Sequence, residues 1–392
     1  MRCDEVKKAL YNCKKKQASV RMVSYAGKLV LAPMVRAGEL PTRLLALKYG
    51  ADLVWSPEII DKKLIKCERQ VNDKLGCVDY VIADASSPVF RTCPSLERGK
   101  IIFQIGTATP SLALEAALKV VQDVDGIDIN AGCPKHFSVH SGMGAALLKT
   151  PDTLCAILTA LVDKVGKPYQ KPISVKIRLL ETKETTLQLV KRLCETGISH
   201  LTVHCRTTPM RNRERPIRDY IKQIYEICQD HDVTLIMNGG IQSKSHFEEL
   251  LRDLELPREI GGMMADCAEQ NPTAFHDVPL DWYDVARKYV TIAHAYDNHV
   301  GNTKYMLSRI VPGKSKFYQY FARCKTTQEI EHVLKLLGPD GNPLGDPLLF
   351  IQGCREQEKL AKQRASELKS EQRQAEKRFA SQQMMEPKKA KT

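Results

Sequence analysis

The sequence predicts an α/β fold, a (β/α)8 TIM barrel, with a C-terminal all-helical domain and a charged tail. Eight short apolar runs alternate with amphipathic helical stretches over about 240 residues. Polar or turn-forming residues follow almost every run, and the strand pattern stops after Pro272. A doubly wound open sheet is the alternative, but the Gly-x-Gly-x-x-Gly turn expected after its first strand is missing here.

Each expected barrel strand is a short run of apolar, often β-branched residues. The eight runs are 28–33, 51–56, 101–106, 126–130, 172–178, 200–206, 233–240 and 259–265. Helices are expected between them, for example over 40–49, 111–121 and 185–196, where apolar residues recur with helical spacing. An insertion of mixed polarity spans about residues 60–98.

The domain organisation follows from changes in composition along the chain. We expect a basic leader over residues 1–24, the barrel over 25–277 and a helical domain over 278–354. Residues 355–392 are charged and poor in apolar side chains, so we expect either disorder or a single exposed helix.

Charge points to the class of partner. The chain has 392 residues and a formal net charge of +13, which favours a polyanion such as nucleic acid. No apolar run approaches the ~20 residues that span a bilayer, so no membrane partner is expected. We expect a monomer located in the cytoplasm, the nucleus or both.

The cysteines argue against a zinc site. Thirteen of them are scattered, none in a Cys-x-x-Cys pair, so no metal is expected. This odd number, in a chain whose charged start is a poor secretory signal, indicates reduced thiols.

The stretch Gly126–Leu148 is the strongest candidate for chemistry. A strand ends at Asn130, and Cys133 follows on a Gly/Pro elbow. A thiol with an ordinary pKa of ~8.5 is mostly protonated at neutral pH and can donate a proton. It could instead be a nucleophile, which would need a base such as His136 or His140, or a buried structural thiol.

Other strand ends supply hydrogen-bond donors and glycines rather than general bases. Gln104, Lys176 and Asn238 could contact a polar heterocycle, and Gly239-Gly240 permits close backbone approach to a phosphate. The set suits a flat, phosphorylated cofactor, and FMN fits. In that case the cofactor would carry the chemistry, and the protein would orient it and supply one proton.

Several of these residues have a plain structural alternative. Lys176 could be an exposed strand-end charge, and His204 a buried core residue. Arg178 and Arg206 share the inward parity of their strands and could contact phosphate or base. Glu58 could simply lie in the first turn of a helix.

The motifs together resemble the tRNA-dihydrouridine synthases, in particular the eukaryotic class acting on uridine 20, with fungal members most similar. The resemblance covers about Tyr25 to Cys354. It rests on LAPMVRAGELPTRLLALKYGADLVWSPEIID, GIDINAGCPK with SGMGAALL, VKIR, VHCR and MNGG.

The resemblance implies an FMN enzyme that uses NADPH, with NADH as a possible substitute, to reduce the C5–C6 bond of a tRNA uridine. Cys133 stands at the position of the proton donor, and the helical domain resembles the family's tRNA-binding module. The substrate side would include Glu58, Asn130, Arg178 and Arg206. The flavin contacts implied are Pro33, Met34, Val35, Gln104, Lys176, His204, Asn238, Gly239, Gly240, Ala265 and Asp266.

One position departs from the family pattern. Many members have an arginine after the eighth strand that helps hold the flavin phosphate, whereas this chain has Asp266. Two other functions remain open from the sequence. One is an FMN barrel oxidoreductase acting on a small pyrimidine, and the other is a catalytically weak RNA-binding barrel.

Overall fold

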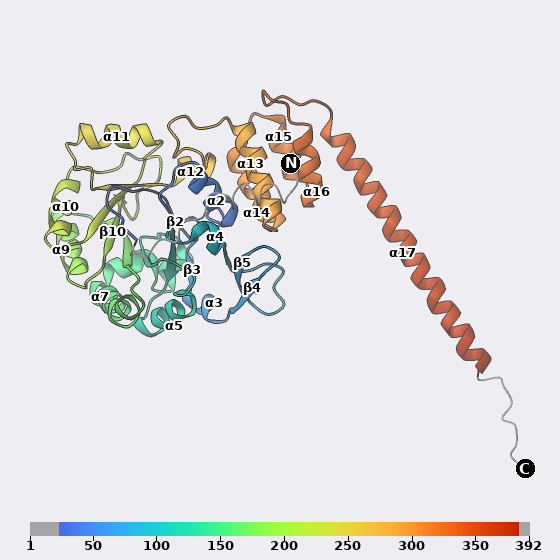
Figure 1. The fold of residues 1–392 in the computed structure, drawn as a ribbon, viewed down its shortest axis with the longest axis horizontal. Coiled ribbons are helices and arrows are strands. Elements are labelled where there is room, and N and C mark those ends of the chain that lie inside the picture. Colours follow the sequence, from blue (N-terminus) through green and yellow to red (C-terminus); the bar gives the residue numbers. More distant parts are fainter. Residues whose placement is uncertain (1–22, 384–392) are drawn as a thin grey trace, which may run out of the picture.

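A computed structural model describes residues 23–383 and shows a closed parallel barrel with helices around it (Figure 1). Pairing of β2 with β7 closes the ring, so the barrel prediction is confirmed and the open doubly wound sheet is wrong. The eight strands are β1 (Leu29–Leu31), β2 (Leu53–Trp55), β7 (Ile101–Gly106), β8 (Gly126–Ala131), β9 (Ile173–Leu179), β10 (His200–Thr207), β11 (Thr234–Asn238) and β12 (Gly261–Met264).

The helices around the barrel bury one apolar face each. In α10 (Ile221–Gln229), the buried residues Ile221, Ile224, Tyr225 and Cys228 follow i, i+3, i+4, i+7 spacing. The other helices around the barrel are α2 (Leu40–Lys48), α5 (Pro110–Val120), α6 (His136–His140), α7 (Pro151–Leu161), α8 (Lys167–Tyr169), α9 (Lys183–Cys194), α11 (Lys244–Asp253) and α12 (Asp266–Gln270). A 3-10 segment, η1 (Gly144–Lys149), and a π segment, η2 (Val162–Gly166), flank α7.

The insertion after β2 is more ordered than its mixed polarity suggested. A two-residue strand β3 (Ile59–Ile60) pairs with β7, and α3 (Asp61–Ile65) follows. Strands β4 (Glu68–Asn72), β5 (Cys77–Val81) and β6 (Phe90–Thr92) form an antiparallel sheet, ending in α4 (Pro94–Glu97). Because β3 follows Glu58 directly, the alternative of a first helical turn there is wrong.

Helices α13 (Trp282–Ala295), α14 (Val300–Ile310), α15 (Lys316–Arg323) and α16 (Thr327–Lys335) form the helical region after the barrel. Their core contains Tyr289, Met306 and Phe317 and is continuous with Leu44 and Leu45 of α2. The helical region is therefore packed directly on the barrel's first helix.

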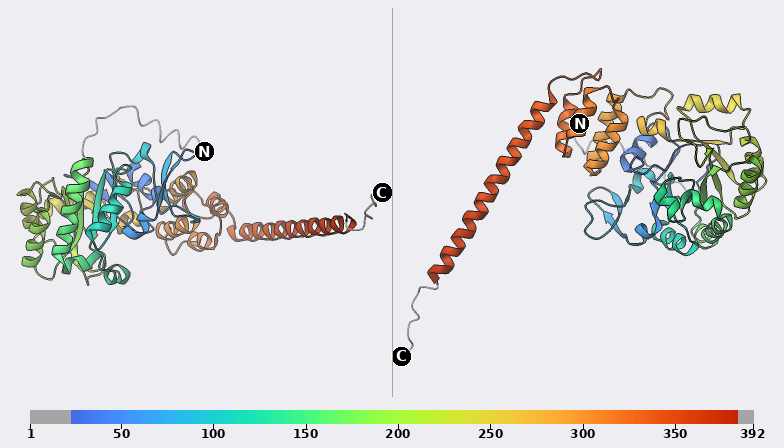
Figure 2. Two further views of the ribbon diagram at one scale, coloured as in Figure 1. Left: turned by 90° about the horizontal axis from the view of Figure 1, so that it is seen from below. Right: turned by 180° about the vertical axis from the view of Figure 1, so that it is seen from behind.

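A single helix, α17 (Pro347–Gln383), leaves this region and projects away from the rest of the molecule (Figure 2). It begins before the tail boundary expected at residue 355. The domain boundaries stay predictions, and residues 1–22 of the expected leader lie outside the described residues.

Candidate functional site

A cavity of about 290 Å³ opens where the barrel strands end. This is the face on which TIM-barrel active sites are built. It contains more than half of the predicted site residues, contributed by β9, β10, β11 and the loops after β1 and β12. Those lining it are Pro33, Lys176, Arg206, His204, Asn238, Gly239, Gly240, Ala265 and Asp266.

His204 lies in this cavity as a neutral imidazole. Burial is the main cause that holds its pKa well below the ordinary value, and the charges of Lys176, Arg178 and Arg206 add to it. Arg206 Nη1 lies 3.1 Å from His204 Nε2. Because a guanidinium can only donate, Nε2 accepts and the ring proton is assigned to Nδ1. His204 can thus donate one hydrogen bond.

Lys176 supplies a positive charge to the same cavity. Its backbone is in register with Asn130 of β8 on one side and Thr202 of β10 on the other. Burial, reinforced by Arg178, lowers its pKa to about 8, so the amine is still largely protonated at neutral pH. The exposed strand-end alternative does not describe this side chain, because it lines the cavity.

The glycine turn after β11 lets other groups approach its backbone. Gly239 has φ +111°, and a Cβ there would come within 2.9 Å of His204 Cδ2. Arg218 donates from Nη2 to the Gly239 carbonyl over 2.5 Å, while its buried Nε has no hydrogen-bond partner in the described structure. Sequence reasoning missed Arg218, because it lies in a loop without periodicity.

The Cys133 elbow is held by Asn130, the last residue but one of β8. The side-chain oxygen of Asn130 accepts from the backbone N–H groups of Gly132 and Cys133, each over 3.0 Å. The Cys133 carbonyl accepts from the N–H of Ala145 over 2.9 Å. Gly144 has φ +59°, and a Cβ there would lie 2.7 Å from the Cys133 carbonyl, so the Gly-rich run closes against the elbow.

The surroundings of Cys133 favour the protonated thiol. Burial raises its pKa above the ordinary value and outweighs a backbone hydrogen bond from Lys135, which lowers it, while the nearby Glu58 carboxylate adds to the rise. His136 and His140 instead stack on each other, with ring centroids 5.5 Å apart. A raised pKa suits a proton donor and disfavours a thiolate nucleophile.

Glu58 is itself perturbed. Burial raises its pKa to about 7, although a hydrogen bond with Asn130 and the charge of Lys135 oppose the shift. Its Oε1 would lie 2.6 Å from a Cβ placed on Gly106. The carboxyl group therefore lies near Asn130 and Cys133, and its role on the substrate side stays a prediction.

Arg178 and Gln104 are buried and already engaged within the protein. Arg178 donates from Nε to the Gly132 carbonyl over 3.0 Å and from Nη1 to the Thr207 carbonyl over 3.0 Å. Gln104 donates to Asp128 Oδ2 over 2.7 Å. Burial raises the Asp128 pKa to about 6. The sequence analysis missed Asp128, although it shares the inward parity of Asn130.

Comparison with known proteins identifies the family. A family model described as "Dihydrouridine synthase (Dus)" matches residues 52–343. The chain belongs to the dihydrouridine synthase family. This confirms the resemblance and the expectation of an enzyme of this family.

Relatives named for position 20 of tRNA are the more similar. The chain is 62% identical over 353 residues to the Saccharomyces cerevisiae "tRNA-dihydrouridine(20) synthase [NAD(P)+]", covering 87% of this chain and 92% of that protein. The Schizosaccharomyces pombe protein of the same name is 48% identical over 321 residues, which is 80% of this chain and 66% of that protein. The S. cerevisiae "tRNA-dihydrouridine(20a/20b) synthase [NAD(P)+]" is 31% identical over 223 residues, 57% of this chain and 56% of that protein.

Asp266, where this dihydrouridine synthase departs from the family pattern, is hydrogen-bonded to another residue of the cavity. Asp266 Oδ1 accepts from Asn212 Nδ2 over 3.0 Å, and both residues line the cavity. Asn212 belongs to the loop after β10, and its carbonyl accepts from Arg206 Nη2 over 2.8 Å. The acidic side chain is thus tied to the loop that Arg206 also holds.

Three predicted flavin contacts lie outside the residues that line the cavity, namely the buried Gln104 and the neighbours Met34 and Val35. Met34 is half-buried and packs against the barrel core and the helical region, while Val35 is 47% exposed. Both follow Pro33, which does line the cavity. Their roles stay predictions.

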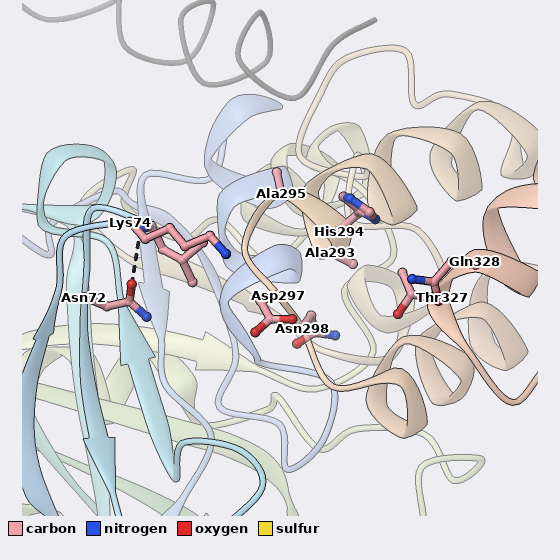
Figure 3. A pocket seen from close by; sticks show the side chains of 10 residues that line it. Asn72, Lys74, Ala293, His294, Ala295, Asp297, Asn298, Thr327 and Gln328 are labelled. Carbon is pink, nitrogen blue, oxygen red and sulfur yellow. Dashed lines mark hydrogen bonds between the residues drawn. The ribbon is translucent and has the colours of Figure 1, made fainter. Parts of the chain in front are cut away.

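A second cavity, of about 380 Å³, lies away from the barrel mouth. Figure 3 shows it between Asn72 and Lys74 of the antiparallel sheet and residues of the helical region such as His294 and Gln328. None of the predicted site residues lines it.

Residues 23–383 contain no cluster of three His, Cys, Asp or Glu side chains suited to a metal ion. They also contain no helix with the length and apolar character needed to cross a membrane.

Proposed function

We propose that this chain is a tRNA-dihydrouridine(20) synthase that reduces the C5–C6 double bond of uridine 20 with FMN as cofactor and NADPH as reductant (NADH is a possible substitute). One observation carries the proposal. The Cys133 elbow follows β8 at the end of the barrel where the cavity opens, and its thiol is near enough to Lys176 to affect the pKa of that amine, in a chain 62% identical to a yeast protein of that name.

The cavity residues fit a flat, phosphorylated cofactor. Lys176 lines the cavity as a cation with no hydrogen-bond partner in residues 23–383, and His204 has an Nδ1–H to donate. The Gly239 backbone is packed closely by the His204 and Arg206 side chains, so no larger residue fits there, and the Nε–H of Arg218 has no partner in the described residues. These groups offer positive charge and donors to a phosphate and to ring carbonyls.

When bound, reduced FMN supplies the hydride that the uracil ring accepts at C6. The protein then has to supply one proton at C5. We assign this proton to Cys133, whose raised pKa keeps the S–H bond intact until the reaction. The S–H bond breaks as the C5–H bond forms, and the thiolate left behind recovers its proton from solvent.

Asn130 and Arg178 position this donor. Asn130 fixes the two N–H groups of the elbow, and Arg178 holds the Gly132 carbonyl, so the thiol is presented on a rigid turn. Such positioning contributes to the rate because the reacting atoms start close to their final geometry. Arg178 and Arg206 are proposed to act on the substrate side through the loop they hold.

The tRNA itself is proposed to bind the helical region next to this mouth. A net charge of +13 favours a polyanion, and a uridine must leave its stack to reach the cavity, at a cost of a few kcal/mol. We propose that the protein acts as a monomer, in the cytoplasm, the nucleus or both.

A spectroscopic titration tests the proposal. Purified protein supplied with FMN should show a bound-flavin band near about 450 nm, which NADPH bleaches without oxygen and unmodified tRNA restores. Protein that cannot bind FMN would contradict the proposal. Recovery of the band by free uracil or orotate, but not by tRNA, would favour a small-molecule oxidoreductase.

A further inference from the structure

Helix α17 holds its side chains away from the rest of the protein. It has 37 residues, which corresponds to a length of about 55 Å. Its start is anchored by buried Ile351 and by Arg355, which donates to the Arg323 carbonyl over 2.6 Å. From Lys359 to Gln374 every residue is exposed, and Figure 1 shows this part projecting from the molecule.

Four of the five basic residues between Lys359 and Gln374 gather on one face of this exposed stretch, and Arg364 lies on the opposite face with the glutamates. At about 100° per residue, Lys362, Lys369 and Arg373 fall within about 40° of one another, with Lys359 at the edge of the same face. Glu367 and Glu371 lie about 140° and 180° from Lys362. Small and neutral residues share the basic face, namely Ala365, Ser366, Ser370 and Gln374.

Among the residues whose side chains the structure describes, no ion pair involves Lys359, Lys362, Lys369 or Arg373. Lys369 and Arg373 are four residues apart, a spacing at which like charges repel and destabilise a helix. A bound polyanion would relieve this repulsion.

A protein helix is a poor partner for the same stretch. Pairing of helices needs apolar residues repeating every 3.5 residues. Between Lys359 and Gln374 the exposed large apolar residues are Leu360 and Leu368, which are too far apart for such a seam. Charge complementarity therefore favours nucleic acid over a second copy of the chain.

We propose that Lys359, Lys362, Lys369 and Arg373 form a second RNA-binding surface, which contacts the phosphate backbone of the tRNA substrate outside the catalytic cavity. The face extends for about 21 Å along the helix, from Lys359 to Arg373. Identifying the polyanion as tRNA rests on the proposed function.

Salt-dependent binding of an unmodified tRNA transcript to the full-length protein tests this surface. Each phosphate contact contributes about −0.9 to the slope of log K against log salt for a duplex. The variant Lys362→Gln/Lys369→Gln/Arg373→Gln should bind about tenfold or more weakly at 50 mM salt, with a slope smaller by roughly 2 to 3. Circular dichroism should show unchanged helicity, because Gln is a good helix former.

A charge-matched variant separates the face from overall charge. It adds Gln357→Lys, Ala361→Lys and Ala375→Lys, which lie about 100–140° from Lys362, to the three Gln substitutions. We expect it to bind as weakly as the Gln variant. Wild-type affinity in either variant, or a wild-type dimer in sedimentation that depends on α17, would overturn the proposal.

The result of this binding test does not depend on whether the catalytic proposal is correct. Flavin content and the rate of dihydrouridine formation at saturating tRNA should be the same in all three proteins, while the tRNA concentration for half-maximal rate rises in the variants. If none of them forms dihydrouridine, the proposed function fails, and the binding curves still decide whether the face binds RNA.

Discussion

Arg206 Nη1 lies 3.1 Å from His204 Nε2, a contact that fixes the histidine as a neutral donor with its proton on Nδ1. The neighbouring cations Lys176 and Arg178 act in the same direction, and burial contributes most. The barrel mouth is thus positively charged around a histidine that does not titrate near neutral pH.

The change of FMN affinity with pH should therefore come from Lys176 and not from His204. Between pH 5.5 and 7.5 the dissociation constant should change with pH in the same way in the wild type and in His204→Gln, because the His204 pKa lies well below this range and the FMN phosphate, with a second pKa of about 6, titrates in both. Above pH 8 affinity should fall as Lys176, with a pKa of about 8, loses its charge. Flavin fluorescence titrations measure both ranges, and Lys176→Met should remove the fall. A step near pH 6.5 that is present in the wild type and absent in His204→Gln would contradict the assignment.

Arg218 should supply the positive charge for the FMN phosphate that Asp266 cannot supply. Its Nε has no hydrogen-bond partner in the described residues, and its Nη2 is fixed on Gly239. Arg218→Gln should weaken FMN binding about tenfold or more, since a hydrogen bond to a charged group is worth about 1.5–3 kcal/mol. The exposed Arg215→Gln is the control and should change affinity little. Equal effects of the two substitutions would indicate a general charge effect.

Glu58 should make stability depend on pH. Its folded-state pKa of about 7 lies above the ordinary pKa of a glutamate. Glu58 therefore stabilises the folded state fully at pH values below its ordinary pKa, and this stabilisation is lost as pH rises through 7. The unfolding free energy of Glu58→Gln, measured relative to that of wild type, should rise by on the order of 2 to 3 kcal/mol from pH 5 to pH 8.5. Chemical denaturation at both pH values measures this gain.

Exposed Glu115→Gln provides the reference for this measurement. It should change unfolding free energy by a similar, small amount at both pH values. If Glu58→Gln behaves in the same way, the Glu58 carboxyl is not held protonated by its site.

The buried pair Arg43–Glu97 should be a major support of the insertion. Arg43 Nε lies 2.6 Å from Glu97 Oε1, and both side chains are fully buried. Glu97→Ala should cost about 3–5 kcal/mol of unfolding free energy, because it leaves an unpaired buried charge. Lys28→Ala breaks a pair that is 37% exposed and should cost about 1 kcal/mol or less. Denaturation midpoints compare the two, and equal losses would contradict this ranking.

The barrel could be predicted because its strands are buried apolar runs that end in polar residues. The stretch 101–106 was predicted as a strand and is β7, and 126–130 corresponds to β8 (Gly126–Ala131). The antiparallel sheet of the insertion could not be predicted in the same way. Strand β4 is polar and mostly exposed, so it lacks the apolar alternation that marks a half-buried strand.

The site could be predicted where function depends on residue type at a strand end, as for Lys176, His204 and the Gly239-Gly240 turn. The site could not be predicted where function depends on the direction in which a side chain points. Arg178 donates to carbonyls of two loops, and Arg218 reaches the Gly239 carbonyl from a loop without periodicity. These contacts depend on the loop backbone, which no local sequence pattern specifies.

The most direct test of the central claim is to map dihydrouridine in unmodified tRNA incubated with FMN-loaded protein and NADPH. The wild type should form dihydrouridine at position 20. Cys133→Ala should still have its flavin reduced by NADPH but form dihydrouridine about 10²–10⁴ times more slowly, the usual contribution of a positioned proton donor. Normal dihydrouridine formation by Cys133→Ala, or none at position 20 by the flavin-loaded wild type, would contradict the account.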